Sequence, residues 1–165
     1  MCVRVSDLEI RQIGYSAPAA RTLVEGAMAD LRQRYGGPGD DAPVEAVEFE
    51  PPAGCFLVAW LHGEPVACGG WRTLSHLSGA GGPDGVAEIK RMYAVPGVRG
   101  TGVAVALLQA VEASAREHGM RRIVLETGGE NPEAIAFYAR NGYGRISNYG
   151  FYKDEPDCVS FGRDL

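Results

Sequence analysis

"VPGVRGTGVAVALL" (residues 95–108) runs from a turn containing three glycines and one arginine into an apolar, helix-like repeat. A turn of this kind before a helix leaves backbone N–H groups without partners at the positive end of the helix dipole. Glycine at positions 100 and 102 keeps those N–H groups uncovered, and Arg99 adds a permanent positive charge. The stretch indicates an anion-binding site, although an ordinary connection between a strand and a helix fits the same letters.

The patterns on either side of this turn predict a mixed α/β fold in a single domain, residues 1–165. An apolar stripe follows the turn at helical spacing: Val103, Leu107, Val111 and Ala115. Strands are expected at residues 8–12, 55–74 (a hairpin), 86–95, 121–127, 143–152 and 157–165. Helices are expected at residues 16–36, 102–118 and 131–141, the first capped by Ser16 and the last by Asn131. Residues 37–54 read as a long loop with room for one helical turn.

Composition excludes several classes of protein. The net charge of −5 argues against nucleic acid or an anionic membrane as partner, because both attract basic surfaces. No segment approaches the roughly 18 apolar residues of a membrane helix, and no secretory signal is apparent, so we expect a cytoplasmic protein. The cysteines show no CxxC pair and no histidine at ligand spacing, which argues against a disulfide framework or a metal site: Cys2, Cys55, Cys68 and Cys158.

Three phosphate-binding motifs compete for the glycine turn. A Walker A loop is excluded, since no Gly-Lys-Ser or Gly-Lys-Thr occurs. A dinucleotide fingerprint has its first two glycines at 100 and 102 and an acidic residue, Glu126, after the next strand. Its third glycine is replaced by Val105, whose side chain would separate helix from strand. A nucleotide-dependent oxidoreductase is therefore a minor alternative.

The third candidate motif is Arg or Gln, two residues, Gly, one residue, then Gly or Ala, and Arg99 to Ala104 fits every position. Around it, AEIKRMYAVPGVR (residues 87–99) and the spacing of Asn131, Ala134 and Tyr138 complete a pattern that resembles the GNAT N-acetyltransferase superfamily. The resemblance implies an α/β fold with a six- to seven-stranded mixed sheet, flanked by helices. It also implies that the sheet splays between its fourth and fifth strands to admit acetyl-CoA.

This resemblance also assigns a cofactor site. Backbone groups of one segment would hold the CoA pyrophosphate, with the arginine as charge partner: Val98, Arg99, Gly100, Thr101, Gly102, Val103 and Ala104. Backbone groups of Met92, Tyr93 and Ala94 would pair with the pantetheine arm, and one N–H there would polarise the thioester carbonyl. Asn131 would face the arm while also capping its helix.

The same resemblance suggests how protons move. Tyr138 would protonate the departing CoA thiolate, a role that suits a weak acid; its alternative is a tyrosine on a buried helix face. An attacking amine must lose a proton, and Glu88 is the candidate base, with an ordinary surface glutamate as the alternative. Glu126 is a second candidate base, although its place on a buried strand favours a structural hydrogen bond.

The predicted reaction moves an acetyl group from acetyl-CoA to a primary amine on a small molecule or peptide, by direct attack in a ternary complex. A non-catalytic acyl-CoA sensor on the same fold is the alternative, and a homodimer is possible for either. An acidic loop contains Asp40, Asp41, Glu45, Glu48 and Glu50. It falls where the family places its variable substrate-binding segment. The loop could attract a cationic amine or be an ordinary solvated surface.

Overall fold

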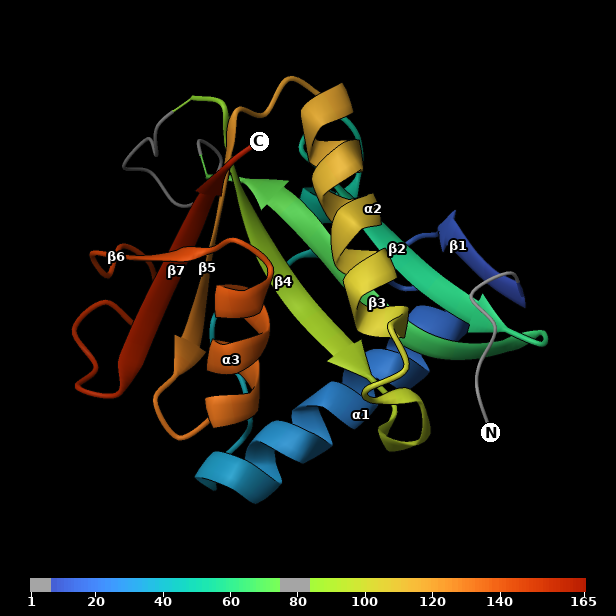
Figure 1. Cartoon of the computed structure of the whole chain (residues 1–165), viewed down its shortest axis with the longest axis horizontal. Coiled ribbons are helices and arrows are strands. Elements are labelled where there is room, and N and C mark those ends of the chain that lie inside the picture. Colours follow the sequence, from blue (N-terminus) through green and yellow to red (C-terminus); the bar gives the residue numbers. More distant parts are fainter. Residues whose placement is uncertain (1–6, 75–83) are drawn as a thin grey trace.

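The computed structural model describes residues 7–74 and 84–165, which form one mixed seven-stranded sheet with helices on both faces (Figure 1). The strands lie in the order β1-β2-β3-β4-β5-β7-β6. Their bounds are β1 Leu8–Gln12, β2 Gly54–Leu61, β3 Glu64–Thr73, β4 Val86–Ala94, β5 Arg122–Gly128, β6 Gly144–Ile146 and β7 Cys158–Asp164. The helices are α1 Pro18–Tyr35, α2 Val103–Glu117 and α3 Pro132–Arg140, with 3-10 turns η2 Ala46–Phe49 and η4 Pro96–Val98.

Strand β2 shows how the two faces of the sheet are covered. Its residues are almost all buried, because alternate side chains enter two separate cores. Leu57 and Ala59 pack with the buried stripe of α2, whereas Phe56 and Val58 pack with Ala20 and Leu23 of α1. A strand covered on both sides reads as a continuous apolar run, which is the pattern of residues 55–59.

Strands β4 and β5 are joined only at one end. Their parallel pairing covers Val86–Glu88 against Arg122–Val124. Beyond Glu88, β4 stays paired with β3 as far as Ala94, while β5 stays paired with β7 as far as Gly128. The two strands therefore diverge into a V that opens towards α1 (Figure 1), which confirms the predicted splay. All other strand pairs are antiparallel, unlike the mostly parallel sheet of a dinucleotide-binding fold.

Two local predictions were wrong. Helix α1 begins at Pro18 with Ala17 as its N-cap, and no side chain caps it; proline suits this first position because its missing N–H is not needed there. The strand expected over residues 143–152 ends at Ile146. The chain then forms a loop, in which the hydroxyls of Tyr149 and Tyr152 donate hydrogen bonds to Glu88 and Asp40.

Candidate active site

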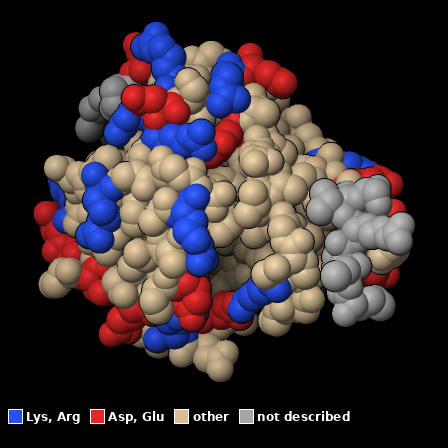
Figure 2. All heavy atoms as spheres, in the orientation of Figure 1, with Lys and Arg blue, Asp and Glu red and all other residues tan. Residues whose placement is uncertain are grey.

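A cavity of about 470 Å³ opens where β4 and β5 separate. Figure 2 shows a hollow on this face, with charged side chains of both signs along its rim. Eight of the predicted cofactor-binding residues line the cavity: Met92, Tyr93, Ala94, Arg99, Gly100, Ala104, Asn131 and Tyr138. Segments far apart in the sequence thus meet around one space.

The glycine turn presents free backbone donors at the start of α2. Gly100 and Gly102 have φ of 76° and 92°, a region that disfavours any side chain. The N–H groups of Gly102, Val103 and Ala104 have no hydrogen-bond acceptor among the described residues. A Cβ at position 100 or 102 would meet nothing within 4 Å, so no other part of the chain packs against these two glycines. This is a ready site for an anion.

Four residues of the predicted pyrophosphate segment, Val98, Thr101, Gly102 and Val103, do not line the cavity, and three of them anchor the turn. Val98 and Val103 are buried in the α2 core, and the Thr101 hydroxyl donates to the Val98 carbonyl at 2.6 Å. Arg99 donates through Nε to the Ala94 carbonyl at 3.0 Å and forms an ion pair with Asp30. Its side chain is 48% exposed, so the guanidinium stays accessible beside the free N–H groups.

A bulge interrupts β4 beside the cavity. The register with β3 shifts between Cys68 and Gly70, and Arg91 adopts a left-handed φ of 60°. An arginine in this region is uncommon, and the extra residue re-aims the side chains around it. The bulge precedes Met92, Tyr93 and Ala94, whose β5-facing edge lies beyond the last β4–β5 pair.

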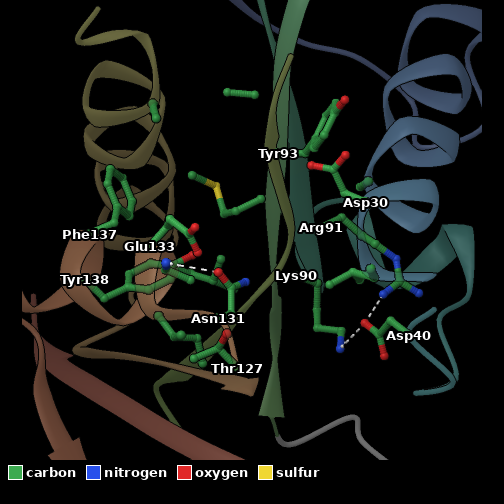
Figure 3. A pocket seen from close by; sticks show the side chains of 18 of the residues that line it. Asp30, Asp40, Lys90, Arg91, Tyr93, Thr127, Asn131, Glu133, Phe137 and Tyr138 are labelled. Atoms are coloured by element: carbon green, nitrogen blue, oxygen red, sulfur yellow. Dashed lines mark hydrogen bonds and ion pairs between the residues drawn. The ribbon is translucent and has the colours of Figure 1, made fainter. Parts of the chain in front are cut away.

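Asn131 and Tyr138 lie on α3 at one wall of the V (Figure 3). The Asn131 side chain accepts a hydrogen bond from the Ala134 N–H at 3.2 Å, which confirms the helix cap. Tyr138 is 6% exposed and packs against Phe137 and Tyr143, so the buried-face reading is also correct. Burial raises the pKa of Tyr138 well above its ordinary value. Its hydroxyl makes no hydrogen bond to the described residues and remains a neutral donor at the cavity wall.

Glu88 is held by other side chains. It is 2% exposed; Oε1 accepts from Arg72 Nη2 at 2.9 Å, and Oε2 accepts from the Tyr149 hydroxyl at 2.6 Å. Arg72 also pairs with Glu48 at 2.8 Å. The surface-glutamate alternative is wrong, because Glu88 is buried. Its role as a base stays a prediction, and this geometry does not favour it, since Glu88 does not line the cavity.

Glu126 lines the cavity from β5. Its Oε1 accepts the backbone N–H groups of Gly150 and Tyr152 at 3.1 and 3.2 Å, which confirms the expected structural hydrogen bonds. Its Oε2 has no partner among the described residues. Burial, and then the negative charge of Glu88, raise the pKa of Glu126 above its ordinary value. A carboxyl group with a raised pKa and a free oxygen at a cavity is a candidate general base.

Two of the five carboxylates of the acidic loop are paired with cations of the sheet, whereas Asp41, Glu45 and Glu50 are exposed. Asp40 pairs with Lys90 and Arg91 of β4, and Glu48 pairs with Arg72. Asp40 and Glu48 therefore already have cation partners within this chain, and the attraction of a cationic amine by the acidic loop stays a prediction. Lys90 and Arg91 were missed as site residues, although two adjacent cations inside a strand with buried neighbours are a signal that could have found them.

Among residues 7–74 and 84–165, no helix is long and apolar enough to cross a membrane, and no group of three or more His, Cys, Asp or Glu side chains is placed to hold a metal ion.

A splayed sheet with free N–H groups at a helix start beside the opening is the arrangement of an acyltransferase that uses an acyl-CoA. Sequence comparison agrees: the model of the Acetyltransferase (GNAT) family matches residues 24–143, and this chain belongs to that family. An uncharacterized N-acetyltransferase of Escherichia coli strain K12, YjgM, is 33% identical over 141 residues, which cover 83% of this chain and 73% of the relative. The protein is thus an acetyl-CoA-dependent acyltransferase.

Solved structures show the same fold. A Klebsiella pneumoniae protein described as an acyl-CoA N-acyltransferase superposes with a TM-score of 0.77 at 27% identity, covering 96% of this chain and 97% of the other. A GNAT family acetyltransferase from Elizabethkingia anophelis, solved with acetyl-CoA bound, has a TM-score of 0.67 at 16% identity, with coverage of 96% and 99%. The second likeness concerns the fold alone.

Proposed function

We propose that this protein transfers an acetyl group from acetyl-CoA to a primary amine by direct attack in a ternary complex. One observation supports the proposal: the V between β4 and β5 has free backbone N–H groups at one side and a charged chamber at the other. The chamber is formed by Asp40, Lys90, Arg91 and Glu126. Both substrates can therefore occupy the site together, with the thioester between them.

The cofactor half of the site uses backbone groups. Gly102, Val103 and Ala104 would donate N–H groups to the diphosphate, with Arg99 as the nearby cation. The edge of β4 from Met92 to Ala94 would pair with the pantetheine arm, which Asn131 faces from α3. One N–H of this edge would hold the developing oxyanion, a contact typically worth about 10²–10³ in rate.

Proton transfer would use two cavity-lining groups. The amine nitrogen bonds to the carbonyl carbon, its proton passes to Glu126 directly or through water, and the carbon–sulfur bond breaks. Tyr138 then donates its hydroxyl proton to the leaving thiolate and is reprotonated from solvent. We favour Glu126 over Glu88 as the base because Glu126 lines the cavity with a free oxygen, whereas both Glu88 oxygens are occupied.

The cysteines support direct attack over an acyl-enzyme. Cys55 and Cys68 are buried, and burial raises the pKa of each thiol, to about 12 for Cys68. Burial also raises the pKa of Cys158, beside Glu126. A thiol with a raised pKa is a poor nucleophile near neutral pH, since the thiolate is the reactive form. None of the three lines the cavity; Cys2 lies outside the described residues.

The test is release of free CoA from acetyl-CoA across a broad panel of amines, with intact-protein mass measured during turnover. We expect amine-dependent CoA release without an acetyl adduct on the protein. Such an adduct would add about 42 daltons, because an acetyl group replaces one hydrogen. Saturable CoA binding with no turnover on any amine would favour the sensor alternative. A burst of CoA accompanied by the adduct would refute direct attack. The homodimer stays a prediction.

A further inference from the structure

Two buried cations lie in the charged chamber. The side chains of Lys90 and Arg91 are 8% and 7% exposed, and both residues line the cavity. Burying a charged side chain is costly unless an opposite charge or a full set of hydrogen bonds compensates it. The balance of charge around this pair therefore bears on what the chamber binds.

One carboxylate serves both cations. Asp40 Oδ2 accepts from Lys90 Nζ at 3.1 Å and from Arg91 Nη1 (Figure 3). Its Oδ1 accepts from the Tyr152 hydroxyl at 2.7 Å and from the Ala42 N–H at 2.9 Å. Four donors thus surround Asp40. It has no lone-pair direction left for a substrate ammonium, and its one carboxylate is shared between two cations.

The cations keep unused donors. Lys90 has three N–H donors and one acceptor, and Arg91 has no acceptor for Nη2 among the described residues. Arg91 Nε reaches the Tyr15 hydroxyl only at 3.4 Å. A guanidinium with a free amino group beside an ammonium matches the two oxygens of a carboxylate.

The backbone places this arginine at an energetic cost. Arg91 sits in the left-handed region at the β4 bulge, a conformation that is unfavourable for a long side chain. Such outliers persist where the surrounding structure determines them, and they concentrate at ligand clamps. At this position, the bulge turns a strand residue towards Asp40 and α1.

The other charged side chains near the chamber leave the free donors of Lys90 and Arg91 unused. Glu126 contacts the backbone of Gly150 and Tyr152 and forms no ion pair with Lys90 among the described residues, although the charge of Lys90 opposes the rise in its pKa. Arg72 pairs with Glu88 at 2.9 Å and with Glu48 at 2.8 Å. A group that occupies the unused donors of Lys90 and Arg91 must be a hydrogen-bond acceptor, and two cations favour an anionic one.

We propose that the acceptor is an amino carboxylic acid, whose carboxylate binds Arg91 and Lys90 while its amine faces Glu126 and the thioester. This inference rests on the proposed function, because it specifies the substrate class of that reaction. Asp40 then acts as an internal counter-ion that competes with the substrate carboxylate for the two cations.

The test is calorimetric titration of the CoA-saturated protein with the common amino acids and with their carboxamides, which keep the amine and lose the carboxylate. We expect at least one acid to bind, and its amide to bind about 10- to 100-fold more weakly, the effect of losing a hydrogen bond to a charged group. Arg91→Asn should reduce the affinity for the acid to near that for the amide. Asparagine tolerates the left-handed backbone, so CoA affinity should be unchanged. Lys90→Gln gives a second measurement should Arg91→Asn fail to bind CoA.

Controls separate the alternatives. Arg116→Gln, at an exposed position on α2, should bind the acid like the native protein. Asp40→Asn should keep or raise the affinity for the acid, because a competing carboxylate is removed. The proposal is overturned if amides bind as tightly as acids, if no amino acid binds, or if Asp40→Asn abolishes acceptor binding.

Turnover distinguishes this inference from the proposed function. Carboxylate-selective binding without acetylation would refute the transferase proposal and leave the anion site standing. Equal kcat/KM for acids and for amines without a carboxylate would refute the anion site and leave the transferase.

Discussion

Replacing Gly102 by valine should abolish most of the affinity for CoA. The residue has a φ of 92° at the N-cap of α2, directly before the free N–H groups of Val103 and Ala104, and a Cβ there would meet nothing within 4 Å. If valine removes two diphosphate hydrogen bonds of about 1–2 kcal/mol each, the loss is about 2–4 kcal/mol. This corresponds to about 30- to 700-fold in Kd.

The same substitution should strain the fold. A branched side chain in the left-handed region costs about 1–2 kcal/mol, which lowers Tm by about 2–8 °C for a chain of this size. Gly97→Val is the matched control, because Gly97 lies in the same turn, has no positive φ and would meet nothing within 4 Å with a Cβ. We expect that variant to keep native CoA affinity.

Isothermal titration with CoA and acetyl-CoA, alongside thermal unfolding, measures both effects. A folded Gly102→Val protein whose Kd stays within about threefold of native would refute the assignment of the diphosphate to this turn, since about 0.7 kcal/mol is less than one such contact. A Gly97→Val protein with equally weakened binding would show that the turn is merely sensitive to any bulky residue.

Three further predictions concern side chains. Tyr138→Phe should lower kcat about 100-fold or more while leaving acetyl-CoA affinity within about twofold, as initial rates and titration would show; an unchanged kcat would contradict the acid role. In the native enzyme kcat/KM should rise with pH through the raised pKa of Glu126, because the base acts only when ionised. Glu126→Gln should remove that limb of the pH profile, and a retained limb would exclude Glu126 as the base. Arg72→Met should cost about 3–5 kcal/mol in urea unfolding, because it leaves Glu88 buried without a cation. The control Arg122→Met breaks an exposed pair with Asp164 and should cost at most about 1 kcal/mol.

The sequence predicted the fold because each element carries local signals. The apolar stripe of α2 is buried as expected from its spacing, and Asn131 caps α3 as its position before proline indicates. The glycine turn could be read because φ values of 76° and 92° require a residue type that is visible in the sequence. The Ser16 cap failed because the proline two residues later determined where the helix begins.

The acceptor half of the site could not be read in this way. Asp40 and Lys90 are fifty positions apart, and nothing local indicates that their side chains meet. The sequence does not show that Asp40 and Glu48 of the acidic loop are paired, because their counter-ions, Arg72, Lys90 and Arg91, belong to strands of the sheet. No glycine or proline lies in β4 at the bulge, so the sequence of this strand does not indicate that Arg91 adopts a left-handed φ.

The two halves of the site therefore differ in how they are built. The cofactor half depends on backbone N–H groups and on glycines, so many side chains around it can change without loss of the diphosphate site. The acceptor half depends on the loop after β6, where Tyr149 contacts Glu88, Gly150 contacts Glu126 and Tyr152 contacts Asp40. At Gly150 even a Cβ would lie 2.7 Å from a Glu126 carboxylate oxygen. Because one short loop positions three carboxylates, small changes within it can alter the acceptor while CoA binding stays the same.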